Sequence, residues 1–197
     1  MNIWNPFRGE ALTGQQTILA VCLVFVIAGI SGWVYEELFY RLNDGHFSRR
    51  GHGFGPWLPI YAFGMVILLF VTAPVTGSSH GAQTLWKVLL LCALVSGAFE
   101  FLVGWALYHR YDGLRLWDYN TERWNWGNIG GYVCLRSVLV FSVGAVLLMD
   151  TLVPMIGHLA RTLPVWAYTM ITAGPFSLFA VDIVYGYLVR GRWKKGQ

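Results

Sequence analysis

The stretch TILAVCLVFVIAGISGWVYEELFY, residues 17–40, decides the fold of this chain. It is apolar as far as Ile30 and becomes polar toward Glu36. A helix of about 20 apolar residues, rising about 1.5 Å per residue, crosses the roughly 30 Å hydrocarbon core of a bilayer. The run is too long for the apolar part of a signal peptide, and no small-residue cleavage site follows it. We therefore expect a permanent transmembrane helix.

The composition extends this prediction to the whole chain. Of its 197 residues, 56% are hydrophobic and only 12% are charged, about half the charge of a soluble domain. Further apolar stretches lie at residues 57–75, 85–108, 132–153 and 164–189, with a short connection expected over 154–163. These stretches predict an all-α integral membrane protein, a single transmembrane domain of five spanning helices, with a kink at Gly174-Pro175 in the fifth.

Basic residues fall unevenly on the two sides of a five-span chain. The N-terminal side carries three, namely Arg8, Lys87 and Arg161, and the other side carries the remaining eleven of the 14. Because basic residues accumulate on the cytoplasmic side, we expect the N-terminus outside and the C-terminus inside the cell. The polar segments 41–56 and 109–131 then become two structured cytoplasmic loops. The net charge of +4 is too small and too localised to indicate a nucleic-acid partner.

The second of these loops is rich in aromatic residues and glycine. The stretch LRLWDYNTERWNWGNIGGYVCL, residues 114–135, contains three tryptophans, more than a disordered linker carries. We expect an ordered loop at the membrane surface. The tryptophans either form an interfacial belt or cover a site entrance or a partner surface. The cytoplasmic-loop residues that we propose for a site are Arg50 of the first loop and, in the second loop, Arg115, Trp117, Asp118, Tyr119 and Asn128.

A faint internal repeat relates the first and third apolar stretches. A shift of 64 residues places Tyr35-Glu36 over Phe99-Glu100 and Gly32 over Ser96. The repeat would relate residues 25–75 to 89–153 in the same orientation, so it would be parallel.

Ionisable side chains inside the apolar stretches are the candidates for binding a substrate or an ion, because such groups are costly in a bilayer unless they face a cavity or a partner. They are Glu36, Glu100, Arg136 and Asp182, whereas Glu37, on a different helix face from Glu36, is expected to be interfacial. Glu100 lies roughly 12 Å inside the end of its helix, too deep to reach water easily. It either locks helices together through an ion pair or hydrogen bond, or it binds a cation, a substrate amine or a proton. Asp182 allows the same two interpretations, with Tyr185 and Tyr187 as nearby hydrogen-bonding partners.

Several motifs are absent from the sequence. It contains no GxxxxGK[ST] phosphate loop, no GxSxG nucleophile motif and no CxxC pair. His46 and His52 do not have the spacing of a zinc site. We therefore expect no metal and no cofactor, and free cysteines at positions 22, 92 and 134. The glycines of GHGFG, residues 51–55, suit close backbone packing or an anion-binding nest.

Three strings carry a family resemblance: GPWLPIY at residues 55–61, RLWDY at 115–119, and the run from Asn128 to Leu135. GWVYE at 32–36 fits as well. With these strings in this order, the chain resembles, over roughly residues 25–150, the bacterial family described as putative ABC-transporter type IV, or CmpB-like permeases. The resemblance implies a multi-span inner-membrane protein of transport function, with a separate ATPase subunit as a possible partner. The EAA-type coupling loop of importer permeases is not found here.

The leading hypothesis is a small-molecule or ion permease, or transporter subunit, with a cytoplasm-facing polar site lined by intramembrane carboxylates. Five spans are few for a whole pathway, so we expect a homodimer or a partner subunit in the bilayer. The alternative is a membrane-embedded enzyme acting on a lipid or lipid-linked substrate through Glu100, His109, Arg115 and Asp118. The second alternative is a non-catalytic membrane regulator or assembly factor.

Overall fold

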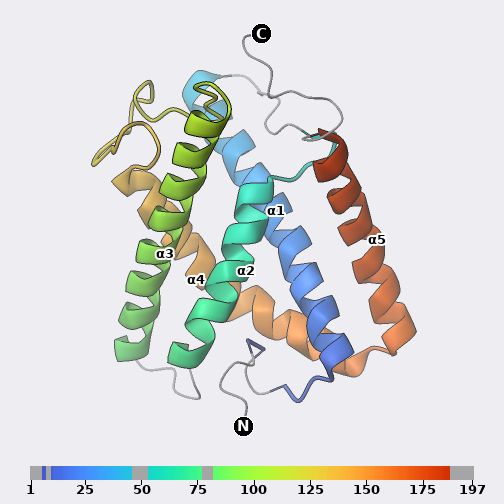
Figure 1. Cartoon of the computed structure of the whole chain (residues 1–197). Coiled ribbons are helices and arrows are strands. Elements are labelled where there is room, and N and C mark those ends of the chain that lie inside the picture. The colour runs from blue at the N-terminus through green and yellow to red at the C-terminus, as the bar shows by residue number, and fades with distance from the viewer. Residues whose placement is uncertain (1–5, 8–9, 46–52, 77–81, 187–197) are drawn as a thin grey trace. The chain divides into compact units, whose positions relative to one another are not determined.

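The computed structural model describes residues 6–7, 10–45, 53–76 and 82–186. Within these ranges the chain forms five α-helices and no strand (Figure 1). They are α1 (Gly14–Asp44), α2 (Pro59–Thr76), α3 (Ala82–Arg110), α4 (Leu135–Thr162) and α5 (Val165–Val184). The all-α prediction is therefore confirmed.

Four helices are long and apolar enough to cross a membrane: α1, α3, α4 and α5. Helix α2 is apolar but shorter, with Pro59–Val75 as its apolar part. The chain is therefore an all-α integral membrane protein. The orientation with the N-terminus outside stays a prediction.

Three helices run further than the sequence indicated: α3 by a few residues at each end, and α1 and α4 as follows. Helix α1 starts after Thr13, whose side chain accepts a hydrogen bond from the backbone of Gln16 in a reciprocal capping box, and ends at the left-handed Gly45. Helix α4 continues through Pro154 to Thr162, so the connection expected over residues 154–163 is wrong. Proline removes one backbone hydrogen bond, but a membrane helix tolerates this because neighbouring groups satisfy the freed carbonyl.

The chain packs as two compact units. In the described residues, unit 1 comprises Leu68–Thr151, and unit 2 comprises Phe7–Ile67 together with the chain from Leu152 onward. The boundaries between the units fall inside α2 and α4. The expectation of a single transmembrane domain stays a prediction.

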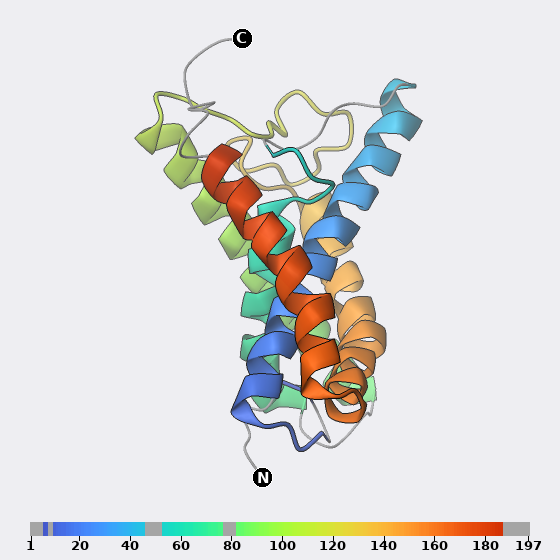
Figure 2. The same cartoon turned by 90° about the vertical axis from the view of Figure 1, so that its right-hand side faces the viewer.

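Unit 2 is built on the packing of α1 against α5 (Figure 2). Its core contains Phe25 of α1 and Phe179 of α5, with ring centroids 5.0 Å apart, and the indole of Trp57 stacks on Phe179 at 4.8 Å. Phe7 is fully buried beside Gly157. The N-terminal segment is thereby fixed to the second half of α4.

Unit 1 joins α3, the aromatic loop and the first part of α4. Gly97 of α3 lies against Val138 of α4, where an added Cβ would be 3.1 Å from a valine methyl. Gly104 faces Trp117 and Tyr132 of the loop. Small residues on α3 thus let the loop and α4 approach the helix closely.

We predict that Gly32→Ala destabilises the protein through the contact between α1 and α2. A Cβ at this position would lie 2.1 Å from Cγ and 2.6 Å from Cβ of Tyr61, atoms that cannot move without shifting the residue. Overpacking of this kind costs about 1–3 kcal/mol, which would appear as a lower melting temperature in detergent. Gly144→Ala is the matched control, since nothing lies within 4 Å of the added atom. Equal melting temperatures for the two variants would contradict the close packing at Gly32.

Candidate functional site

Glu100 is the centre of a buried polar cluster in unit 1. It lies on α3 with only 3% of its surface exposed. The Tyr119 hydroxyl donates a hydrogen bond to one carboxylate oxygen, and the Ser137 hydroxyl lies 2.8 Å from the other. Glu100, predicted to lie deep in its helix, is therefore also buried within the protein. Its hydrogen-bonding partners come from the loop and from the first turn of α4.

Ser137 has two acceptors within reach of its single hydroxyl hydrogen. Its Oγ lies 2.8 Å from Oε2 of Glu100 and 2.8 Å from the carbonyl oxygen of Cys134. A hydroxyl has one donor and two acceptor lone pairs. Ser137 can therefore donate to Glu100, or donate to Cys134 and accept a hydrogen bond from a protonated Glu100.

Tyr119 covers Glu100 from the loop side. The Tyr119 side chain is buried, and its backbone N–H donates to the Gly131 carbonyl at 3.2 Å, which fixes its position. Burial, and next the negative charge of Glu100, raise the pKa of Tyr119 above its usual value. The phenol consequently stays a neutral donor and does not compete for the proton of Glu100.

Arg136 and Glu122 form an ion pair beside this cluster. Their charged atoms are 2.5 Å apart, and both side chains are mostly buried. The Arg136 guanidinium lies 5.6 Å from the centre of the Tyr119 ring, a cation–π distance. The pair thus connects the loop to the start of α4 next to the residue that covers Glu100.

Arg115 holds the loop together from inside. Its guanidinium lies 4.7 Å from the ring centre of Tyr108 and 4.9 Å from that of Tyr132, and it donates to the Gly130 carbonyl at 3.0 Å. It also pairs with Asp118 at 3.4 Å. These contacts give Arg115 a structural role in ordering the loop.

The other predicted loop residues are part of the same scaffold. Asp118 accepts from the Asn120 side chain at 2.7 Å, and Asn128 accepts from the Gly131 N–H at 2.8 Å. The Trp117 indole donates to the Tyr132 carbonyl at 2.8 Å. The loop is therefore ordered by its own hydrogen bonds, as the tryptophan content predicted.

Gly131 is the position where this scaffold requires glycine. Its φ is +82°, and an added Cβ would lie within 2.5 Å of side-chain atoms of Arg115, Asn120 and Asp118. Only glycine combines the left-handed backbone with such a close approach.

Glu36 belongs to unit 2, and its partner there is Tyr61, whose hydroxyl donates to it at 3.0 Å. Tyr61 is the third residue of α2, and Ser137 is the third residue of α4. In each unit a glutamate late in one helix therefore meets a hydroxyl at the start of the next. The 64-residue shift does not place Tyr61 over Ser137, and the parallel repeat stays a prediction.

Asp182 is enclosed by donors that cannot change roles. The backbone N–H groups of Phe54 and Gly55 donate to it at 2.7 Å and 3.1 Å, and the Trp57 indole donates at 2.6 Å. A Cβ on Gly53 would lie 2.1 Å from Oδ2, so glycine is required there. The described part of the glycine-rich segment thus forms an anion-binding nest, and its occupant is the chain's own carboxylate.

Some predicted residues lie outside the described part of the chain: Arg50, His46, His52 and Tyr187. In the described part, no group of three or more His, Cys, Asp or Glu side chains could hold a metal ion. The three cysteines are free, as predicted.

The sequence reasoning missed the hydroxyl partners Tyr61 and Ser137 and the ion-pair partner Glu122. Tyr61 stood in the string GPWLPIY, but nothing in that string connected it with Glu36. Ser137 and Glu122 carry no motif. Their roles depend on how the loop folds back onto α3 and α4.

We predict that Asp182→Ala strongly lowers stability, because three N–H donors lose their charged acceptor. Buried donors left unsatisfied cost about 1–3 kcal/mol each, so the melting temperature in detergent should fall clearly. Added formate or acetate should restore part of the loss by occupying the vacated nest. Asp150→Ala, at an exposed aspartate of α4, is the control and should change little. A melting temperature of Asp182→Ala equal to that of the control would show that the nest does not stabilise the fold.

The comparisons with known proteins agree with this architecture. The family model described as "Putative ABC-transporter type IV" (ABC_trans_CmpB) matches residues 23–187, which is most of the chain. Searches of curated proteins and of solved structures each find no match. The match includes the helices that carry Glu36, Glu100 and Asp182 as well as the aromatic loop. The chain therefore belongs to the putative ABC-transporter type IV family of multi-pass membrane proteins.

Proposed function

We propose that the chain is a permease or transporter subunit in which Glu100 takes up and releases a proton, or a small cation in its place. The observation that carries this proposal is the position of the Ser137 hydroxyl, 2.8 Å from both Glu100 and the Cys134 carbonyl. The carboxylate can be ionised, accepting from Ser137 and Tyr119. It can also be protonated, donating to Ser137 while Ser137 donates to Cys134. Both states keep their hydrogen bonds.

This property matters because a buried carboxylate usually favours one charge state strongly. Donors that cannot accept, such as backbone N–H groups, favour the ionised form alone. A hydroxyl can donate to the ionised carboxylate or accept from the protonated one, so it lowers the free-energy cost of changing between these two forms. A carboxylate that repeatedly binds and releases a cation requires such a low cost. Intramembrane acids commonly mark such pathways.

Access to Glu100 requires the loop to move. Tyr119 covers the carboxylate, and the Arg136–Glu122 pair lies against the Tyr119 ring. In this proposal the loop is a cytoplasmic cover, and displacement of Tyr119 exposes Glu100 to water. The same movement offers a way to couple the site to a partner subunit.

The proposed partners follow from what the sequence lacks. The chain has no phosphate loop of its own, so the energy comes from an ion gradient or from a separate ATPase subunit in the bacterial inner membrane. A homodimer would supply further helices for the pathway. The enzyme alternative has less support, because Arg115 and Asp118, its proposed phosphate-binding and acid–base groups, are engaged in ordering the loop.

We predict that Glu100→Gln abolishes proton uptake into proteoliposomes that contain the purified chain and a luminal pH dye, under an imposed membrane potential. The amide is close in shape to the acid but cannot carry the proton. Tyr119→Phe should alter the rate without abolishing it, since the phenyl ring still covers the site. Asp150→Asn, an exposed acid on α4, is the matched control and should behave like the unmodified chain.

Two outcomes would count against this role. Uptake by Glu100→Gln equal to that of the control would exclude Glu100 as the carrier. Proton flux through the unmodified chain no higher than that of empty vesicles would favour a regulatory role for the protein. If Glu100→Gln then also lowered the melting temperature, Glu100 would have a structural role.

We also predict that the aromatic loop faces the cytoplasm. A cysteine introduced by Thr121→Cys, on the exposed part of the loop, should resist a membrane-impermeant thiol reagent in intact cells and react after permeabilisation. Thr162→Cys, at the opposite end of α4, should react in intact cells. The unmodified chain, with its three native cysteines, gives the background. The reverse labelling pattern would overturn the orientation.

A further inference from the structure

An exposed apolar surface continues from α4 onto the aromatic loop. Along α4, the exposed residues Leu135, Leu139, Val143 and Leu147 recur every four positions and form one row on the helix. They belong to a helix with the length and composition of a membrane span. An apolar row of this kind, exposed on a spanning helix, faces the hydrocarbon of the bilayer.

The loop extends this row beyond the end of the helix. The Leu135 N–H donates to the Trp126 carbonyl at 2.7 Å, so Trp126 is bonded to the first residue of α4. Trp126 is 56% exposed, and it meets the 50% exposed Trp124 edge to face at 5.8 Å. Ile129 of the same segment is also exposed, and its backbone N–H donates to the Val133 carbonyl at 2.9 Å.

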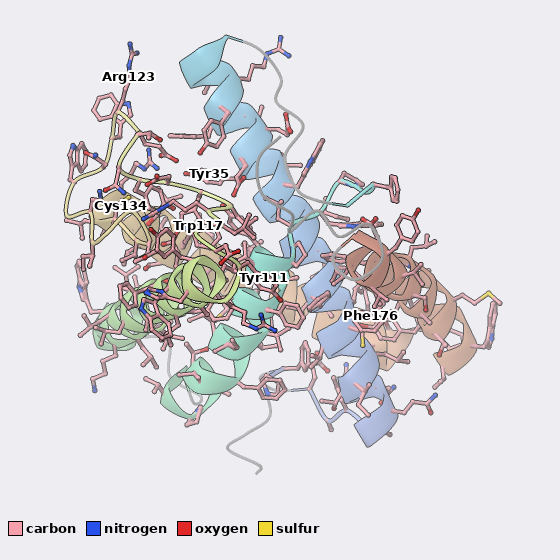
Figure 3. The ribbon with its side chains drawn as sticks, turned by 45° about the horizontal axis from the view of Figure 1, so that its top comes forward. Tyr35, Tyr111, Trp117, Arg123, Cys134 and Phe176 are labelled. Carbon is pink, nitrogen blue, oxygen red and sulfur yellow. The ribbon has the colours of Figure 1, made fainter. Side chains whose placement is uncertain are left out.

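The position and chemistry of this surface match one occupant. It begins where the apolar row of α4 ends, and the end of a spanning helix is where the chain is expected to reach the lipid headgroups. Tryptophan is favoured at that depth because its indole combines an apolar body with a polar N–H. Arg123, exposed next to Trp124, projects from the outer edge of the loop and can meet a lipid phosphate (Figure 3).

We propose that Trp124, Trp126 and Ile129 form a lipid-binding surface that inserts into the headgroup–acyl boundary of the membrane. The surface anchors the cover of Glu100 in the bilayer, because Tyr119 is bonded to the same segment through the Asn125 side chain, at 3.0 Å. The anchoring does not depend on whether Glu100 carries a proton, so it can be tested separately from transport.

The test is photocrosslinking with the full chain reconstituted in vesicles of phosphatidylethanolamine and phosphatidylglycerol. Benzoylphenylalanine is introduced in place of Trp124 or of Trp126, and in place of Thr121 on the polar edge of the loop as the control. Lipid adducts at positions 124 and 126, several-fold above those at 121, are expected. A crosslink to a second copy at position 126, or equal lipid adducts at all three positions, would overturn the proposal.

A second measurement covers the case in which these variants do not fold. The tryptophan fluorescence of the chain is quenched in vesicles that contain phospholipid brominated near the headgroup. Trp124→Phe combined with Trp126→Phe removes two of the ten tryptophans and keeps the apolar aromatic surface. The quenched fraction should fall in this variant, and an unchanged fraction would show that the two indoles do not lie at the lipid boundary.

Discussion

The structure depends on the need to satisfy carboxylates that are removed from water. An acid on an apolar helix must find donors within the chain, because isolated charge in a low-dielectric environment is very costly. Glu100 finds Tyr119 and Ser137, and Asp182 finds two backbone N–H groups and an indole. These bonds fix the aromatic loop to α3 and α4 in unit 1, and they fix the glycine-rich segment to α5 in unit 2. The carboxylates therefore stabilise the fold in addition to forming the candidate site.

The kind of donor separates the two acids in their proposed roles. The N–H donors around Asp182 can only donate, so its carboxylate acts as an acceptor that ties the glycine-rich segment to α5. The Ser137 hydroxyl can reverse its direction, whereas the Tyr119 hydroxyl donates to Glu100 in both states, and this difference from Asp182 supports the proposed change of charge at Glu100. Two acids for which the sequence allowed the same two interpretations thus receive different proposed roles, and the difference depends on partners that are distant along the chain.

The features that could be predicted from the sequence are those that local patterns determine, namely the spans and the ordered loop. Long apolar runs identified the spans, and the tryptophans of residues 114–135 indicated an ordered loop. The end of α4 was misplaced: the segment from Pro154, expected to be a short connection, is helical to Thr162, because a membrane helix accommodates proline. The depth of Glu100 followed from helix geometry, but its partners did not. Ser137 and Glu122 reach their places only when the loop folds back, and such long-range contacts leave no periodic signal.

The loop is therefore constrained from two directions. Its inner side is tied to Glu100 through Tyr119 and to α4 through the Arg136–Glu122 pair. Its outer side presents Trp124 and Trp126 in continuity with the lipid-facing row of α4. A cover held only by its inner contacts would separate from the site once Tyr119 was displaced. A cover also anchored in lipid can release Glu100 and return to the same place, which is what a repeated transport cycle requires.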